Sequence, residues 1–418
     1  MKSFIPVSAD SHFPIQNLPY GVFKLKVGSK PSVGAAIGEY VLDLSILEHK
    51  GIFRKTNLGD KIVFESGSLN KFMATGRETW KQVRTVLQMI LSEDNPLLRD
   101  NNDLRKIALI PMKDVIMCLP VEIGDYTDFY SSKEHATNVG IMFRGKENAL
   151  MPNWVHMPIA YHGRSSSIVV SGTNIFRPKG QKKAANAALP LYGPTNLFDF
   201  ELEMGFFIGT PNKLGEPINV NETFDHIFGM VLVNDWSARD IQTWEYQPLG
   251  PFLAKNFATS ISPWVVTMEA LAPFRSPGPE QNPQPMEYLQ SNGDWAYDIK
   301  LDVELTTGKQ IEPVTISRSN YKYLYWNICQ QLAHHTVNGC NVRTGDMMAS
   351  GTISGQEKDS YGSMLELTWR GENPIKLPSG EERKFIHDGD TLTIKGYCEA
   401  DGYKVGFGEV KGTVLPAK

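Results

Sequence analysis

The stretch 197-LFDFELEMGFFIG-209 decides the fold, because its residue types alternate as those of a β-strand do. Successive side chains of a strand point to opposite faces. One face carries three carboxylates in a row, Asp199, Glu201 and Glu203. The other face carries only large apolar side chains, those of Phe198, Phe200, Leu202, Met204 and Phe206. The pattern predicts a strand with an oily face and an acidic face.

The acidic face has two interpretations. Carboxylates two residues apart point the same way and repel each other, and on a solvated edge strand water would screen that repulsion. The apolar content of the stretch favours burial instead, and buried carboxylates share a proton or bind a cation. Oxygen ligands suit Ca²⁺ or Mg²⁺ better than zinc. Asp128 in GDYTDFYSS and Asp235 after FGMVLVN are placed to join such a site.

The bulk properties describe an ordinary globular chain. It has 418 residues, of which 41% are hydrophobic and 21% charged, a length that suggests two domains. A net charge of -4 gives no basic field for nucleic acid or an anionic membrane. The longest apolar runs are too short to span a bilayer, and the start lacks the apolar run of a signal peptide. With four scattered cysteines, taken as reduced thiols, we expect a cytoplasmic (cytosolic) protein.

Two parts of the chain differ in character. We expect an N-terminal domain over residues 1–118, a small α+β unit, and a C-terminal domain over residues 119–418. In the first, Thr75-x-x-Glu78 matches a capping box that opens a helix, and apolar residues then recur at helical spacing. In the second, short β-branched and aromatic segments with many Gly and Pro residues predict a mostly β domain.

A second polar cluster lies in VNDWSARDIQTWEYQPLGPFLAKNF. Ser237-x-x-Asp240 is able to cap a short helix, on which Arg239, Gln242 and Tyr246 fall on one face. The face is either a solvated surface or a set of donors aimed at an anionic substrate.

Three further residues stand apart from these clusters. A lone lysine among apolar residues, such as Lys255, is usually a snorkelling surface residue. His135 lies in a predicted loop of small residues, where most histidines have no function. Glu366 lies among Met364, Leu365, Leu367 and Trp369, so its carboxylate needs a partner, and a histidine is one candidate.

In combination these motifs resemble the fumarylacetoacetase (fumarylacetoacetate hydrolase) family over essentially the whole chain. The motifs that carry the resemblance occur in the order DYTDFYSSKEHATNVGIMFRG, YHGRSSSIVVSG, ELEMGFFIG, VNDWSARDIQTWEYQPLGPFLAKNF, ASGTISG and GSMLELTWRG. The resemblance implies a mainly β (α+β) fold with a small N-terminal SH3-like β-barrel and a larger C-terminal β-rich roll. It also implies a homodimer and hydrolysis of the carbon–carbon bond of 4-fumarylacetoacetate to fumarate and acetoacetate in tyrosine catabolism.

The resemblance also implies roles for matching residues. The Ca²⁺ ligands would be Asp128, Glu201, Glu203 and Asp235, and a Mg²⁺ site would use Asp235, Lys255 and Thr259. His135 would be the general base with Glu366 as its partner, beside the carbonyl donors Arg239, Gln242 and Lys255. Substrate contacts would be Tyr130, Arg144, Gln242, Tyr246 and Thr352. Asp199 is outside these sets, either behind the ligands or exposed.

Two rival functions remain open at this point. Other enzymes of the superfamily decarboxylate, hydrate or isomerise oxo-acids with similar acidic clusters. A calcium-binding module without catalysis would explain the acids but not His135, Glu366 or the donors.

Overall fold

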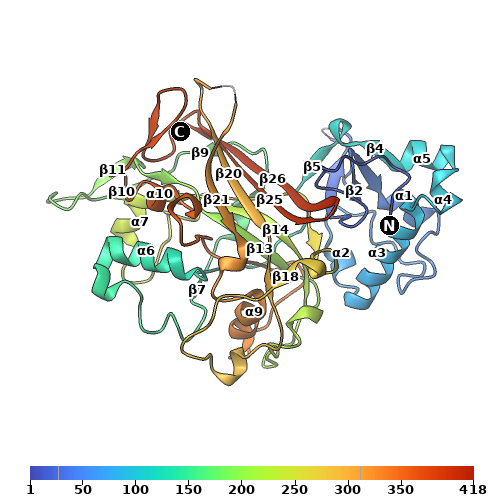
Figure 1. Ribbon diagram of the computed structural model, residues 1–418, viewed down its shortest axis with the longest axis horizontal. Helices are drawn as coiled ribbons and strands as arrows, with labels where there is room; N and C mark the ends of the chain where they lie inside the picture. Colours follow the sequence, from blue (N-terminus) through green and yellow to red (C-terminus); the bar gives the residue numbers. More distant parts are fainter. Residues whose placement is uncertain (27, 311) are drawn as a thin grey trace.

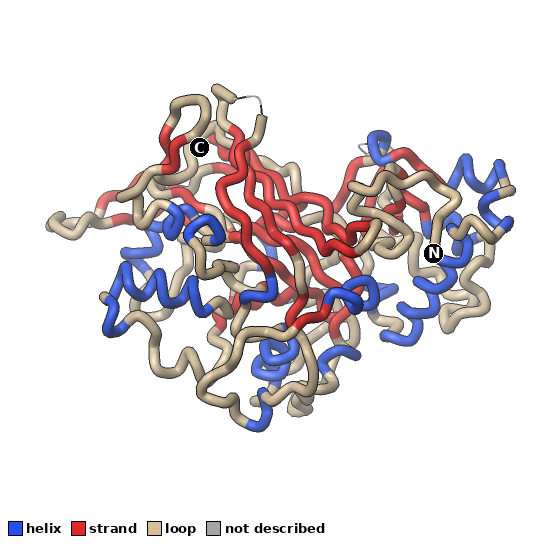
Figure 2. Tube along the Cα trace, in the orientation of Figure 1, coloured by secondary structure: helices blue, strands red, loops and turns tan. Residues whose placement is uncertain are grey.

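The computed structural model describes residues 1–26, 28–310 and 312–418. A smaller N-terminal part lies beside a larger C-terminal part (Figure 1). Strands run through the middle of the C-terminal part, and helices lie mostly on its outside (Figure 2). The expected mainly β, α+β architecture is confirmed.

The largest sheet has eight strands. In spatial order they are β7 (Ala160–His162), β6 (Tyr126–Phe129), β22 (Met347–Ala349), β13 (Leu202–Ile208), β14 (Ile227–Asp235), β16 (Thr259–Ile261) and β8 (Ile168–Val170), with β17 (Val266–Thr267) paired to β14. The second part of the acidic stretch, β13, therefore lies at the centre of this sheet. Every residue of β13 is buried, so the interpretation as a solvated edge strand is wrong.

The stretch 197–209 forms two strands rather than one continuous strand. The first is β12 (Phe198–Asp199), which pairs with β15 (Ser237–Ala238), and the second is β13. The break follows from side chains that take the place of ladder partners. The N–H of Phe200 donates to Asp199 Oδ1 (2.9 Å), and the N–H of Glu201 donates to Asn234 Oδ1 (3.2 Å).

A second, five-stranded sheet covers one face of the first. Its order is β21 (Val314–Asn320), β20 (Lys300–Thr306), β25 (Thr391–Ala400), β26 (Tyr403–Leu415) and β9 (Ile175–Phe176). β25 and β26 pack against β14. Gly396 permits the close approach, because a Cβ atom there would lie 2.6 Å from the Leu232 side chain. Alternate residues of β13, such as Met204 and Phe206, fill the core between the sheets.

Short elements complete the C-terminal part. The helices are α6 (Lys133–Arg144), α7 (Arg239–Glu245), α8 (Met268–Leu271), α9 (Ile328–Thr336) and α10 (Met364–Leu367). Three further strand pairs are β10 (Lys179–Lys182) with β11 (Leu191–Pro194), β18 (Arg275–Ser276) with β19 (Ala296–Tyr297), and β23 (Ile375–Lys376) with β24 (Glu382–Arg383).

The N-terminal part is built on a five-stranded antiparallel sheet. Its order is β4 (Leu109–Pro111), β3 (Tyr40–Asp43), β2 (Ser32–Ile37), β1 (Tyr20–Lys24) and β5 (Ile116–Cys118). Its helices are α1 (Leu44–His49), α2 (Asn70–Met73), α3 (Arg77–Leu91), α4 (Pro96–Arg99) and α5 (Asn102–Ala108). The capping box predicted for α3 is wrong: its N-cap is Gly76, and the Thr75 hydroxyl donates to the Phe72 carbonyl instead.

The N-terminal part packs on the other face of the large sheet. Tyr20 of β1 forms a backbone bridge with Val265, and the Trp80 ring lies edge-on 5.1 Å from the Phe228 ring of β14. Phe228, Val231 and Val233 thereby join one core with the N-terminal residues. The two faces of β14 are thus covered by two different cores.

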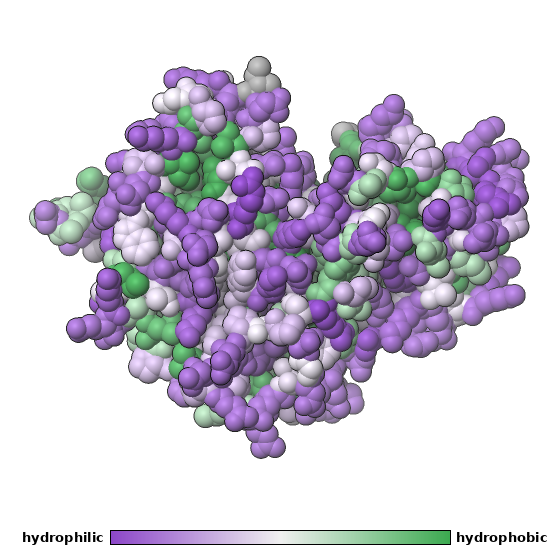
Figure 3. All heavy atoms as spheres, viewed as in Figure 1, coloured by the Kyte–Doolittle hydropathy of each residue, from purple (hydrophilic) through white to green (hydrophobic). Residues whose placement is uncertain are grey.

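The visible surface is mostly hydrophilic, with hydrophobic side chains in small separate groups (Figure 3). Across the described residues, no helix has the length and apolarity needed to cross a membrane.

Candidate active site

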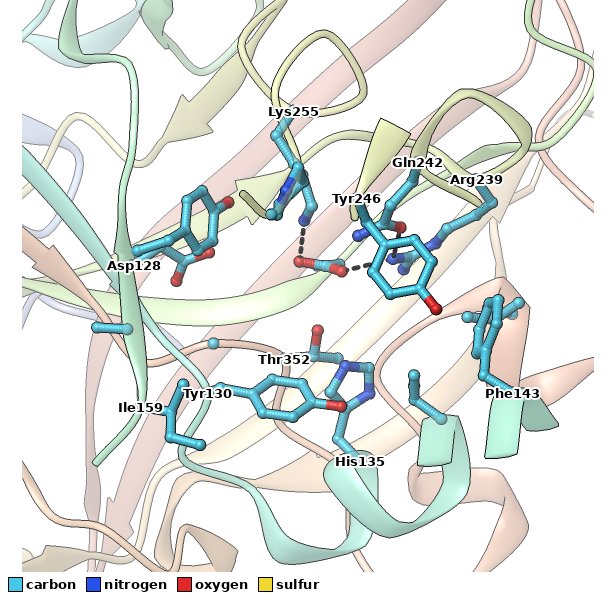
Figure 4. Close-up of a pocket in the computed structure, with 18 of the residues that line it drawn as sticks. Asp128, Tyr130, His135, Phe143, Ile159, Arg239, Gln242, Tyr246, Lys255 and Thr352 are labelled. Carbon is cyan, nitrogen blue, oxygen red and sulfur yellow. Dashed lines mark hydrogen bonds and ion pairs between the residues drawn. The ribbon is translucent and has the colours of Figure 1, made fainter. Parts of the chain in front are cut away.

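A cavity of about 460 Å³ opens beside Asp128 of β6 and Glu201, which lies between β12 and β13. Figure 4 shows His135 and Tyr130 on one side of the cavity. Lys255, Gln242 and Arg239 lie on the opposite side in the same view (Figure 4). The cavity walls come from β6, β7, α6 and α7 and from the segments that follow α7 and β22.

Four buried carboxylates from three strands and one strand break lie together beside this cavity, and Asp128 and Glu201 line it. Each of the four places an oxygen within 4.8 Å of the others' oxygens. The four residues are Asp128, Glu201, Glu203 and Asp235. The sheet register explains their meeting, because β22 joins β6 to β13: Ala349 pairs with Asp128 on one side and with Gly205 on the other.

The carboxylates of Glu203 and Asp128 have the character of cation ligands. Both Glu203 oxygens and Asp128 Oδ1 are buried, with no hydrogen-bond partner in the described part of the chain. Burial, reinforced by the neighbouring carboxylates, raises the pKa of Glu203 and of Asp128 well above the ordinary range. Buried oxygens without partners are costly, and a divalent cation bound between them would remove that cost. The residues present therefore fit a divalent ion.

Lys255 lies between two of the acids and is not a surface residue. Its Nζ donates to Asp235 Oδ2 (2.7 Å) and to Glu201 Oε2, and its side chain is 7% exposed. Burial opposes the charge of Lys255, yet the carboxylates of Asp235 and Glu201 raise its pKa overall. The Thr259 hydroxyl donates to Asp235 Oδ1 (2.7 Å), so the residues of the predicted Mg²⁺ site are in contact.

Arg239 begins α7 and bridges the acids to the cavity. Its Nη1 donates to Glu201 Oε1 (2.8 Å) and to Gln242 Oε1 (3.1 Å). Its Nη2 is buried and has no partner among the residues that the structure describes. Burial works to raise the pKa of Glu201, but Lys255 and Arg239 outweigh it and lower that pKa below the ordinary range.

The predicted cap of α7 is wrong. The N-cap residue is Ala238, which makes no side-chain cap bond, and the Ser237 hydroxyl donates to the Asp235 carbonyl instead. The Asp240 carboxylate accepts the N–H of Asn196 (2.8 Å), which ties α7 to the loop before β12. The helix still presents Arg239 and Gln242 to the cavity, as their spacing predicted.

His135 and Glu366 are hydrogen-bonded neighbours. His135 lies in the first turn of α6, not in a loop, and the Ser132 hydroxyl caps that turn by accepting the His135 N–H. Its Nδ1 lies 2.7 Å from Glu366 Oε2, and Asn138 Nδ2 donates to Glu366 Oε1 (3.0 Å). The Ser363 hydroxyl also donates to Glu366 Oε2 (2.8 Å).

These bonds keep Glu366 ionised. Burial works to raise the pKa of Glu366, but His135 and the donors from His135, Asn138 and Ser363 lower it overall. A carboxylate at Nδ1 selects the tautomer that carries its proton there, which leaves Nε2 as the free acceptor. His135 lines the cavity, so this acceptor is available to a molecule bound there.

All the predicted substrate contacts line the cavity: Tyr130, Arg144, Gln242, Tyr246 and Thr352. The Tyr130 ring stands edge-on to His135 with 5.3 Å between ring centroids. Thr352 Oγ1 is buried and without a partner in the described ranges. Arg144 stands at the exposed rim, where its guanidinium donates to the carbonyls of Asn148 and Ala149.

Several residues at the site were missed from the sequence, among them Tyr161 and Asn138. Tyr161 in β7 lines the cavity, and its hydroxyl donates to Asp235 Oδ2 (3.1 Å). Asn138 lies one turn after His135 on α6 and holds Glu366. The helical position of Asn138 would have signalled it, but nothing in a single sequence distinguishes Tyr161 from other tyrosines.

Comparison with known proteins places the chain in a family. The family model described as Fumarylacetoacetate (FAA) hydrolase C-terminal matches residues 126–415, and that described as Fumarylacetoacetase N-terminal matches residues 16–120. The chain belongs to the fumarylacetoacetase family. This is a family of enzymes, and the resemblance stated from the motifs is confirmed.

Named fumarylacetoacetases are similar to the chain over its whole length. That of Dictyostelium discoideum is 58% identical, covering 100% of this chain and 98% of the relative. That of Homo sapiens is 56% identical, covering 99% of each, and that of Arabidopsis thaliana is 54% identical, covering 100% and 99%.

Solved structures share the fold at low identity. A fumarylacetoacetate hydrolase from psychrophilic Exiguobacterium antarcticum is 15% identical with a TM-score of 0.54, covering 96% of this chain and 100% of that one. A maleylpyruvate hydrolase from Sphingobium sp. SYK-6 is 13% identical with a TM-score of 0.53 over the same shares. At this identity the likeness concerns the fold of the fumarylacetoacetase family alone.

Proposed function

We propose that this protein hydrolyses the carbon–carbon bond of 4-fumarylacetoacetate to fumarate and acetoacetate, the last step of tyrosine catabolism. Named fumarylacetoacetases at 54–58% identity over the full chain support the substrate. One observation carries the chemistry: the His135–Glu366 pair faces Arg239 and Lys255 across a cavity with a buried acidic cluster at its side.

The proposed cofactors are Ca²⁺ and Mg²⁺. Asp128, Glu201, Glu203 and Asp235 would hold Ca²⁺, and the unpartnered oxygens of Glu203 and Asp128 support this assignment. Asp235, Thr259 and the backbone carbonyl of Lys255 would hold Mg²⁺, since an ammonium group is no ligand for a cation. A bound ion at the acidic cluster would polarise the diketone oxygens of the substrate as a Lewis acid.

The proton chemistry falls to His135. Its Nε2 accepts a proton from water as the oxygen attacks the carbonyl carbon, and Glu366 stabilises the imidazolium that forms. As the carbon–carbon bond breaks, the electron pair stays on the carbon of the acetoacetate fragment. His135 then returns its proton to that carbon. The water oxygen ends in the new carboxyl group of fumarate, which releases the second water proton to solvent, so atoms and charge balance without a covalent intermediate.

The opposite side of the cavity supplies donors. Arg239 Nη2 has no other partner in the described chain, and the Lys255 ammonium and Gln242 amide lie beside it on the cavity wall. Cationic donors fixed before the reaction stabilise an oxyanion more than water does. Tyr130, Thr352, Tyr246 and Arg144 complete the proposal as contacts that hold the two carboxylate-bearing ends of the substrate.

The test compares two reactions in one preparation. We expect loss of the diketone absorbance of fumarylacetoacetate on addition of enzyme with Ca²⁺, and no decarboxylation of oxaloacetate. A preference for oxaloacetate would favour the alternative, another oxo-acid enzyme of the superfamily with decarboxylase, hydratase or isomerase activity. No turnover of either compound, with calcium bound, would favour a binding module.

Cation binding is expected to release protons. Burial, reinforced by the neighbouring carboxylates, raises the pKa of Glu203 and of Asp128 in the metal-free protein, so an incoming cation competes with protons for these carboxyls. The apparent affinity for Ca²⁺ should therefore rise with pH, between about pH 6 and about pH 8. Calorimetry in buffers of different ionisation enthalpy measures the number of protons that are released when Ca²⁺ binds. Equal affinity at both pH values would contradict the prediction.

The remaining proposals concern organisation. We propose a homodimer in the cytosol, with domains at residues 1–118 and 119–418, on the strength of the family resemblance. The end of β5 at Cys118 and the start of β6 at Tyr126 support this boundary. Sedimentation equilibrium would measure the oligomeric state.

A further inference from the structure

We propose that Asp199, which belongs to neither the cation ligands nor the substrate contacts, is a positioning residue that fixes the two catalytic sides of the cavity to each other. The proposal rests on the proposed function, because it concerns the roles given there to Arg239 and Glu366. Asp199 is 0% exposed and does not line the cavity, so it acts through its neighbours.

The two carboxylate oxygens of Asp199 bind groups from both sides of the cavity. Its Oδ2 accepts Arg239 Nε (2.8 Å) and the N–H of Leu365 (3.0 Å). Its Oδ1 accepts the N–H of Met364 (2.7 Å). Met364 and Leu365 open α10, the helix that carries Glu366. A single carboxylate thus connects the guanidinium on one side of the cavity with the helix that orients His135 on the other.

The acceptor capacity of Asp199 is fully used. Besides these three donors, Oδ1 accepts the N–H of Phe200 (2.9 Å), which makes four donors on two oxygens. A carboxylate has about four lone-pair sites, so none remains for a cation. Glu203 is the opposite case, because both of its oxygens lack partners among the described residues. The carboxylates of the acidic row therefore differ in role: Asp199 positions Arg239 and α10, whereas Glu203 is free to bind a cation.

Asparagine at position 199 would disrupt this arrangement while keeping its volume. The amide supplies one acceptor oxygen and one NH₂ group. With the oxygen facing Phe200 and Met364, the NH₂ group faces two donors, Arg239 Nε and the N–H of Leu365. Arg239 and the start of α10 would both shift. A displacement of about 1 Å from a residue that does not touch substrate costs roughly a hundredfold in rate.

The experiment measures Asp199→Asn beside a matched control, Asp390→Asn, in the full-length protein with Ca²⁺. Asp390 is also buried, and its carboxylate accepts Arg383 Nε (2.8 Å), Arg383 Nη2 (3.0 Å) and the N–H of His387 (2.9 Å). For Asp199→Asn we expect kcat to fall about a hundredfold with KM changed less than about threefold. For Asp390→Asn we expect kcat per folded molecule within about twofold of wild type.

A second readout does not depend on turnover. The Nδ1 proton that His135 shares with Glu366 should give a low-field proton resonance, which Asp199→Asn should shift or remove and Asp390→Asn should not. If wild type fails to hydrolyse fumarylacetoacetate, the proposed function fails, and this resonance alone decides the role of Asp199.

Besides an unchanged resonance in Asp199→Asn, three results would overturn the proposal. One is wild-type kcat in folded Asp199→Asn, and another is an equal loss in Asp390→Asn. Should Asp199→Asn not fold, Asp199→Ser, which leaves room for a water, takes its place and should lower kcat at least tenfold. Failure of both variants to fold would assign Asp199 to the fold and reject the positioning role.

Discussion

His135→Gln is expected to lower kcat for fumarylacetoacetate by about three orders of magnitude while leaving calcium binding unchanged. Glutamine nearly fills the imidazole volume and is able to donate to Glu366, but its amide cannot take a proton from water near neutral pH. His135 forms no hydrogen bond with any of the four clustered acids, so the calcium affinity of His135→Gln should equal that of wild type. Stopped-flow absorbance measures kcat, and calorimetry measures the calcium affinity.

The control for this variant is His226→Gln. His226 Nδ1 lies 2.8 Å from the Thr210 carbonyl, and the residue does not line the cavity. Its variant should keep wild-type kcat. Activity within tenfold of wild type in His135→Gln would show that another group activates water, and the proposed mechanism would then be wrong.

Glu203→Gln is expected to change activity and metal-free stability in opposite directions. Activity should fall at least about a hundredfold, because a ligand of the cation is lost. Without metal, the raised pKa of Glu203 means that the folded state keeps a proton that the unfolded chain releases, so stability falls as pH rises. The variant removes this loss, so the metal-free protein should become more stable than wild type at pH values above the ordinary pKa of a glutamate.

Thermal unfolding in chelator, with and without added Ca²⁺, measures these effects. Wild type should gain stability on adding Ca²⁺, and Glu203→Gln should gain much less. Glu48→Gln is the matched control: Glu48 is a buried carboxylate of the N-terminal part whose Oε1 accepts the N–H of Val63 (2.7 Å). It should keep the response of wild type to calcium. A fall in metal-free stability for Glu203→Gln would contradict a cation-binding role.

The sequence predicted best those features that depend on local pattern, such as alternation in a strand and spacing along a helix. Alternation predicted the acidic face of 197–209, and apolar content correctly favoured burial of Glu201 and Glu203. Helical spacing placed Arg239 and Gln242 on one face of α7. Caps were predicted poorly, because Thr75 and Ser237 donate to carbonyls behind them instead of accepting N–H groups ahead.

What the sequence alone could not supply was contact between distant segments. His135 and Glu366 are 231 positions apart, and only the packing of α6 beside α10 brings them together. Lys255 has the setting of a surface lysine until Glu201 and Asp235 are known to flank it. The family resemblance predicted the His135–Glu366 pair and grouped Lys255 with Asp235, but it did not predict the contact between Lys255 and Glu201.

The covering of β14 by two cores has a consequence for how the protein tolerates damage. Val233 touches the N-terminal residues and pairs with Glu203, while Asp235 ends the same strand. The N-terminal part therefore supports the strand that carries Asp235. A substitution that loosens the packing of Trp80 on Phe228 would also disturb β14 and the acidic residues beside it. Such a substitution would lower the activity of the protein although every residue of the active site is unchanged.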